Sequence, residues 1–243
     1  MSDTILVINA GSSSIKFYLY DIDDKAALAP RLGGQLEGIG TSHPRLRVRD
    51  AAGQTLVERD IAPSHAPDVP NGQEVVGTWL SGHLGGAPLA VGHRVVHGGP
   101  DLSEPVIVDD AILARLEAYT PLAPLHQPNN LAPIRVIRER RPWIPQVACF
   151  DTAFHRSHSD VADRYALPDK LYQQGVRRYG FHGLSYEYIA QRLRQALPEI
   201  AMGKIVAAHL GSGVSACAMH QGKSVDSTMG FTCLLYTSDA ADE

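Results

Sequence analysis

The stretch Asn9-Ala-Gly-Ser-Ser-Ser-Ile-Lys16 has a counterpart late in the chain, His209-Leu-Gly-Ser-Gly-Val-Ser-Ala216. Each is a turn of glycine and serine with an apolar run before it and another after it. Two such runs joined by a tight turn predict a β-hairpin. Because the same unit occurs twice and far apart, the sequence predicts two related domains that each open with a hairpin.

The two turns also point to a class of ligand. Backbone N–H groups exposed in a turn of small residues suit phosphate oxygens. A single glycine-serine turn is more often only a turn. Two turns in register, with Lys16 following the first, favour a pair of phosphate-binding turns.

Composition excludes several other classes of protein. The chain has 243 residues, of which 44% are hydrophobic and 20% charged, so it can bury a core. Acidic residues outnumber basic ones 26 to 22, which argues against a nucleic-acid partner. No stretch approaches the roughly 20 apolar residues of a membrane helix, and the first residues do not read as a signal peptide. We therefore expect a cytoplasmic protein with no membrane partner.

The cysteines carry no sign of a metal or a disulfide. Cys149, Cys217 and Cys233 are odd in number and lack the spacing of metal ligands. Two of them sit in apolar runs, where cysteine usually behaves as a small buried hydrophobe. We expect neither a disulfide nor a zinc site.

Apolar periodicity predicts the remaining elements. Strands are expected at 4–9, 15–20, 46–49, 55–59, 89–97, 144–150 and on both sides of the 209–213 turn. Helices are expected at 73–81, at 109–119 with Asp109 as cap, from Asn129 or Asn130 to about 141, and at 184–197. The last has Tyr188, Ile189, Leu193 and Leu197 on its apolar side. Residues 62–72 read as an exposed loop.

The strand at 89–97 holds the first candidate for substrate binding. Side chains alternate along a strand, so Arg94 and Val96 share one face. A guanidinium beside an apolar wall is complementary to a short carboxylic acid. An edge-strand salt bridge is the alternative explanation for Arg94. His93 and His97 do not suggest a metal pair, because the segment reads as a strand rather than a helix.

Further candidates follow the later strands. Asp151 comes directly after the buried strand 144–150, where residues commonly face a cleft, but it could equally cap a helix at 152–157. His182, in Arg178-Tyr-Gly-Phe-His-Gly183, could be a proton carrier, a phosphoryl partner or a packed loop residue. His155 and His158 read as a solvated pair rather than a metal site.

The last residues do not match the rest. Residues 233–243 read CLLYTSDAADE and continue no element that can be placed. The string resembles the translation of a transposon adaptor used in making sequencing libraries. We therefore predict that residues 233–243 are a non-native tail.

Six blocks occur in an order that resembles the acetate kinase (acetokinase) family over residues 4–232. They are Val7-Ile-Asn-Ala-Gly-Ser-Ser-Ser-Ile-Lys16, Gly92-His-Arg-Val-Val-His-Gly-Gly99, Pro124-Leu-His-Gln-Pro128, Phe150-Asp-Thr-Ala-Phe-His155, Arg178-Tyr-Gly-Phe-His-Gly183 and His209-Leu-Gly-Ser-Gly213. The resemblance implies an α/β fold of the actin-like ATPase class, with duplicated ribonuclease H-like domains. The domains would be 1–149, with the acetate side and the first phosphate hairpin, and 150–232, an incomplete nucleotide-binding domain.

The resemblance also implies a role for individual residues. Asp151, His182 and Arg94 would be catalytic, with Arg94 holding the acetate carboxylate and His182 stabilising the moving phosphoryl group. Val96, Leu125 and Phe181 would line the methyl pocket, and Asn9 would be a contact on the magnesium side. The nucleotide would bind Ser12, Ser14, Lys16, His209, Leu210, Gly211, Ser212 and Gly213.

The implied reaction is reversible transfer of the ATP γ-phosphate to acetate, with Mg²⁺ as cofactor and a homodimer as the full-length protein. The chain departs from the family after Thr232, where a second catalytic arginine, a metal-binding glutamate and the adenine pocket are missing. The chain as written is therefore expected to be inactive. Alternatives are a propionate or butyrate kinase, separated by only about 1 to 3 kcal/mol per methylene, and a non-catalytic nucleotide-binding fragment.

Overall fold

The structure is a computed structural model that describes residues 3–23, 27–211 and 213–230. This part of the chain forms two compact units. The first contains residues 3–95, 106–118 and 124–148, and the second contains 96–105, 119–123 and 149–230. Two short segments of the expected first domain thus lie with the second unit, and the domain assignment stays a prediction. The expected foreign tail, 233–243, lies outside the described residues.

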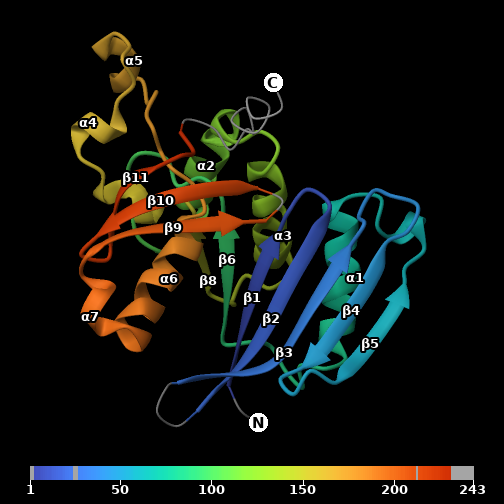
Figure 1. Ribbon diagram of the computed structural model, residues 1–243. Coiled ribbons are helices and arrows are strands. Elements are labelled where there is room, and N and C mark those ends of the chain that lie inside the picture. Colours follow the sequence, from blue (N-terminus) through green and yellow to red (C-terminus); the bar gives the residue numbers. More distant parts are fainter. Residues whose placement is uncertain (1–2, 24–26, 212, 231–243) are drawn as a thin grey trace. The chain divides into compact units, whose positions relative to one another are not determined.

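An eight-stranded sheet forms the centre of the first unit, in the order β5-β4-β3-β2-β1-β6-β8-β7 (Figure 1). β1 is antiparallel to β2 and parallel to β6, so β6 is an interior strand. The strands are β1 (Thr4–Ala10), β2 (Ser14–Ile22), β3 (Leu28–Glu37), β4 (Arg45–Asp50), β5 (Thr55–Asp60), β6 (Ala90–Val95), β7 (Val106–Ile107) and β8 (Gln146–Phe150).

The first hairpin follows from alternation of apolar side chains. In β2, Ile15, Phe17 and Leu19 are fully buried, while Lys16 between them is exposed. The Phe17 ring also decides what its neighbour can be. A Cβ at Gly34 in β3 would lie 2.3 Å from Cζ of Phe17, so only glycine fits there. The sequence did not predict β3, because Pro30 and the two glycines at 33 and 34 interrupt its pattern.

Helices α1 (Val69–Ser81) and α3 (Gln127–Arg140) contact each other and cover one face of this sheet (Figure 1). The unit also contains α2 (Asp110–Ala118) and the 3-10 turn η1 (Pro63–His65). The expected cap of α2 is confirmed, because Asp109 Oδ1 accepts from the backbone N–H of Ile112 over 2.7 Å.

Both of the longer helices begin earlier than expected. Asp68 accepts from the backbone N–H of Asn71 over 2.9 Å and so starts α1 within the segment expected to be an exposed loop, where Val69 and Gly72 are buried. α3 starts at Gln127, which makes the expected cap at Asn129 or Asn130 wrong. Asn130 is instead a buried helix residue.

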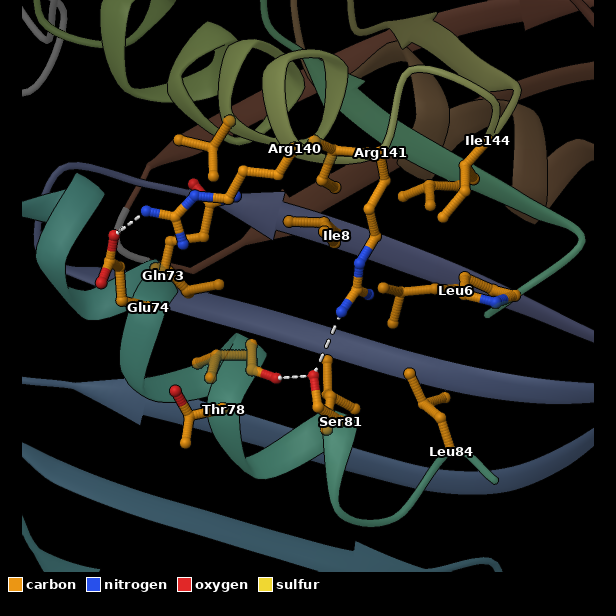
Figure 2. A pocket seen from close by; sticks show the side chains of 18 residues that line it. Leu6, Ile8, Gln73, Glu74, Thr78, Ser81, Leu84, Arg140, Arg141 and Ile144 are labelled. Atoms are coloured by element: carbon orange, nitrogen blue, oxygen red, sulfur yellow. Dashed lines mark hydrogen bonds and ion pairs between the residues drawn. The ribbon is translucent and has the colours of Figure 1, made fainter. Parts of the chain in front are cut away.

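A pocket of about 200 Å³ lies between α1, α3 and the sheet (Figure 2). Its walls are mostly apolar, including Leu6 and Ile8 of β1. Arg140 pairs with Glu74 on α1 beside it, and Arg141 donates to Ser81 Oγ over 3.3 Å. These two contacts join α3 to α1.

The second unit contains a three-stranded antiparallel sheet in the order β11-β10-β9. Its strands are β9 (Lys204–Leu210), β10 (Val214–His220) and β11 (Lys223–Ser227). Its helical elements are η2 (Thr120–Leu122), η3 (Ala153–Ser157), α4 (Asp160–Asp163), α5 (Asp169–Gln173), α6 (Gly183–Ala196) and α7 (Pro198–Ala201). The second predicted hairpin is confirmed as β9 and β10. None of the helices in the described ranges is long and apolar enough to cross a membrane.

α6 packs with a different face from the one expected. Its apolar stripe is largely exposed, since Tyr188 is 60% and Leu197 43% accessible. The buried residues are Gly183, Tyr186 and Ala190, and Tyr186 and Ala190 pack against Cys217 and Met219 of β10. The packed face of α6 is therefore centred on Tyr186 and Ala190 rather than on the apolar stripe that the sequence pattern indicated.

Candidate active site

The first glycine-serine turn joins β1 and β2 and is held tightly. Gly11 donates its backbone N–H to the carbonyl of Ser14 over 2.8 Å. Asn9 and Lys16 are cross-strand partners, so their side chains share one face of the hairpin. Ser14 lies two residues before Lys16 and shares that face, while Ser12 is exposed at the tip.

Asn130, a residue outside the predicted site, supports this turn from behind. Its side-chain amide donates to the carbonyl of Ala10 over 2.5 Å, and both residues are buried. This bond ties α3 to the last residue of β1. The sequence pattern indicated Asn130 only as one of two candidate helix caps, the other being Asn129.

Arg94 lies beside the same turn. Its guanidinium donates to Oδ1 of Asn9 over 3.1 Å, as expected from the parallel pairing of β6 with β1. Arg94 is half-buried on an interior strand, so the alternative explanation as an edge-strand residue is wrong. Arg94, Asn9 and Lys16 therefore form one polar group at the β1–β2 turn.

In the second unit, Asp151 is buried at the end of β8 and lies against the start of α6. Its carbonyl accepts from the backbone N–H of Gly183 over 2.8 Å. A Cβ at Gly183 would lie 2.2 Å from that carbonyl oxygen, so the motif needs glycine at this position. The structure thus brings the predicted residues Asp151 and His182 to adjoining segments. Thr152, and not Asp151, occupies the N-cap position of the 3-10 turn η3, and Thr152 makes no side-chain cap hydrogen bond.

His182 lies between α6 and the second glycine turn. Its φ of 59° is left-handed, a sparsely populated conformation for non-glycine residues. Its ring stacks on His209, and Nδ1 lies 2.8 Å from Ser215 Oγ. A Cβ at Gly213 would lie 3.2 Å from Nε2 of His182, so the turn passes directly beside the ring.

The remaining residues predicted for the second turn differ in exposure. Gly211 donates its backbone N–H to the carbonyl of Gly213 over 3.2 Å, which closes the turn. The side chain of Leu210 is 79% exposed. Ser212 lies outside the described residues.

Two of the three predicted methyl-pocket residues come together. Val96 and Phe181 are buried in one cluster with Ala123, Tyr179 and Met229. Leu125 belongs to the first unit, where its side chain is 59% exposed. A shared pocket of all three stays a prediction.

His155 corrects one interpretation of the sequence. It was expected to be half of a solvated pair, but it is fully buried. Nε2 lies 2.9 Å from the carbonyl of Phe181, and Nδ1 lies 2.7 Å from Ser224 Oγ. Burial lowers the pKa of His155 to about 4, so the ring is neutral near pH 7.

This neutral ring holds the segment that leads to His182. A carbonyl can only accept, so Nε2 of His155 carries the proton and Ser224 donates to Nδ1. A Cβ at Gly180 would lie 2.5 Å from Cγ of His155, which explains the first glycine of the Arg178–Gly183 motif. Nothing in the sequence marked His155 as buried, because a His-x-x-His spacing is equally compatible with a surface.

Comparison with known proteins identifies the family. The sequence model of the acetokinase family matches residues 4–236. The chain belongs to the acetokinase family. The match extends past Thr232 into the first residues of the predicted tail, and residues 237–243 lie outside it.

Two relatives of this acetokinase chain are named acetate kinase. One, from Nitrobacter hamburgensis, is 55% identical over 232 residues, and the alignment covers 96% of this chain and 57% of the relative. Another, from Rhizobium meliloti, is 52% identical, and the alignment covers 93% of this chain and 57% of that relative. The chain thus spans a little over half the length of the curated relatives that it matches.

Solved acetokinases share the fold. A propionate kinase from Francisella tularensis superposes with a TM-score of 0.82 at 33% identity, covering 95% of this chain and 58% of that structure. Acetate kinase from Porphyromonas gingivalis superposes with a TM-score of 0.78 at 34% identity, and the match covers 96% of this chain and 58% of that structure. The α/β fold expected from the sequence, of the actin-like ATPase class, is confirmed, with this chain as its incomplete part.

Proposed function

We propose that the protein carrying this chain is an acetate kinase, which transfers the γ-phosphoryl group of ATP to acetate and releases acetyl phosphate and ADP. The observation that carries the proposal is the contact between Arg94 and Asn9 at the β1–β2 turn. It places a half-buried guanidinium, which suits a carboxylate, beside a turn that suits a phosphate. The family membership supports the same reaction.

The chemistry needs no covalent enzyme intermediate. An oxygen of the acetate carboxylate attacks the γ-phosphorus, and the bond from that phosphorus to the bridging oxygen of ADP breaks with its electron pair. Arg94 aligns the carboxylate, and His182 donates to an oxygen of the moving phosphoryl group. Asp151 provides the carboxylate expected at the centre of the reaction, and Lys16 offers positive charge to the phosphates.

The choice of acid depends on the apolar pocket. We assign Val96 and Phe181, which pack in one buried cluster, to the wall around the alkyl end. A second candidate, propionate kinase, is supported by the structural likeness to the Francisella tularensis enzyme of that name. One methylene separates the two substrates, which corresponds to about 1 to 3 kcal/mol.

We also propose that Mg²⁺ accompanies the nucleotide, with Asn9 on the magnesium side. Among the described residues, no three His, Cys, Asp or Glu side chains gather as a metal site. Oδ1 of Asn9, the expected contact on the magnesium side, accepts from Arg94. Mg²⁺ in kinases usually keeps several waters and is bound by substrate phosphates and one or two carboxylates. We further place the reaction in the cytoplasm, where ATP is available, and the whole protein in a homodimer.

Trapping of the product tests the proposal. The protein expressed from the natural gene that encodes residues 4–232 is incubated with Mg-ATP, hydroxylamine and acetate, propionate or butyrate in parallel. We expect hydroxamate to form, with the highest kcat/KM for acetate. Hydroxamate from none of the three acids would refute the carboxylate-kinase function, and a higher kcat/KM for propionate would replace acetate as the substrate.

A further inference from the structure

Three polar side chains of the second unit form a chain that ends on His182. The Tyr186 hydroxyl lies 2.5 Å from Ser215 Oγ, and Ser215 Oγ lies 2.8 Å from Nδ1 of His182. Tyr186 and Ser215 are 1% and 3% exposed, so bulk water does not compete for these bonds. His182 is half-buried and faces the glycine turn.

The direction of the protons in this chain follows from the available acceptors. Burial raises the pKa of Tyr186, so the phenol keeps its proton at neutral pH. Among the described residues, the acceptor within reach of that proton is Ser215 Oγ. A buried phenol O–H needs such an acceptor.

Ser215 must then give its own proton to His182. A hydroxyl has one proton, and once Ser215 accepts from Tyr186, its proton is directed at the other partner in reach, Nδ1 of His182. An Nδ1 that accepts a hydrogen bond in a neutral imidazole requires the ring proton to be on Nε2.

We propose that Tyr186 and Ser215 are positioning residues that hold neutral His182 in the tautomer with its proton on Nε2. Nε2 is the ring atom beside Gly213 in the second glycine turn. A proton at this atom can be donated to a phosphoryl oxygen, whereas the lone pair of the other tautomer would repel it. The catalytic meaning of this arrangement rests on the proposed kinase function, but the tautomer itself does not.

The first arm of the test is spectroscopic. The full protein is labelled with ¹⁵N-histidine, and the His182 signal is assigned by its loss in His182→Gln. At a pH of about 8.5, above the usual titration range of histidine, we expect Nε2 to carry the proton and Nδ1 to show the shift of a hydrogen-bonded acceptor. Tyr186→Phe and Ser215→Ala, which keep the side-chain packing, should move both shifts toward values averaged over the two tautomers.

A matched control is available on the same helix. Tyr188→Phe also removes a phenol hydroxyl from α6, but Tyr188 is 60% exposed and outside the chain of hydrogen bonds. It should leave the His182 shifts at their wild-type values. A proton on Nδ1 in the wild type, or unchanged shifts in both Tyr186→Phe and Ser215→Ala, would overturn the proposal.

The second arm is kinetic and separates this proposal from the proposed function. Loss of outer partners of metal-bound histidines costs about ten- to a hundredfold in activity, and by analogy we expect a similar loss in kcat with an unchanged KM for acetate. Unchanged kcat together with shifted tautomer signals would remove the catalytic role of the two residues. A wild type that shows the Nε2–H tautomer but makes no acyl phosphate refutes the kinase function alone.

Discussion

The imidazole rings of His182 and His209 are stacked, with ring centres 4.0 Å apart and planes 23° from parallel. Each ring is also held by a hydroxyl from the opposite element. Ser215 of β10 contacts His182 next to α6, and Ser185 of α6 lies 3.1 Å from Nδ1 of His209 in β9. This exchange fixes the start of the helix against the hairpin at the second glycine turn, where the two histidine-containing sequence blocks meet.

Replacing Arg94 with alanine tests its assignment to the acid. Arg94→Ala should mainly raise the KM for acetate, with a loss of kcat/KM of about 2 to 4 kcal/mol, because a charge-assisted contact is lost and the carboxylate is left unpaired. Initial rates at varied acetate and saturating ATP measure this. Arg49→Ala, an exposed arginine on β4, is the control. An unchanged KM for acetate would leave Arg94 with a structural role only.

The bond behind the first turn gives a second prediction. Asn130→Ala leaves the buried carbonyl of Ala10 without this donor, which costs about 1 to 3 kcal/mol of unfolding free energy. Thermal unfolding should show a lower midpoint. Asn129→Ala is the neighbouring control, because its amide donates to Leu125 at the exposed surface over 3.2 Å. Equal midpoints for the two variants would contradict the supporting role of Asn130.

Buried histidines predict how stability depends on pH. Burial lowers the pKa of both His93 and His155 to about 4, below the ordinary value of about 6.5 that holds in the unfolded chain. Between these values the unfolded state binds more protons, so stability is complete above pH about 6.5 and falls as the pH decreases toward 4. Each histidine should account for about 2 kcal/mol of the loss between pH 7.5 and 5.

Urea unfolding at the two pH values measures this loss. His155→Gln should be less stable than the wild type at pH about 7.5 but should lose about 2 kcal/mol less on acidification. His65→Gln replaces an exposed histidine and should show the wild-type loss. An unchanged pH dependence in His155→Gln would mean that the ring is already charged or accessible in the folded protein.

Two glycines with opposite surroundings give a fourth prediction. Gly34→Ala places a Cβ against the buried ring of Phe17 and should destabilise the protein by about 1 to 3 kcal/mol. Gly77→Ala adds a methyl group in open space on α1 and should stabilise it by up to about 1 kcal/mol, because alanine is the better helix former. Midpoints of thermal unfolding that shift in the same direction would contradict this steric account.

The elements that could be predicted are those whose apolar pattern matches their packing. Both hairpins and the cap at Asp109 follow from local sequence. β3 does not, because its glycines are required by the Phe17 ring of the neighbouring strand, and a local reading takes glycine as a break. The packed face of α6 was also missed, because Tyr186 and Ala190, which pack against Cys217 and Met219, lie outside the larger apolar stripe of the helix.

The candidate site shows the same division. Arg94, Asp151 and His182 could be named from motifs and strand ends. Their partners could not, because the contact of Arg94 with Asn9 depends on the pairing of β6 with β1, and that pairing joins segments far apart in the chain. The burial of His155 likewise depends on β11 and on the segment before His182.

The close contacts at Gly180 and Gly183 bear on how this family is recognised. Neither glycine can touch a substrate through a side chain, yet both are required, one by the His155 ring and one by the carbonyl of Asp151. These two positions of the Arg178–Gly183 block therefore record steric fit rather than reactivity. A descendant that had lost catalytic activity would keep both glycines for as long as it adopted this fold. The two glycines are therefore evidence of ancestry first and of catalysis second.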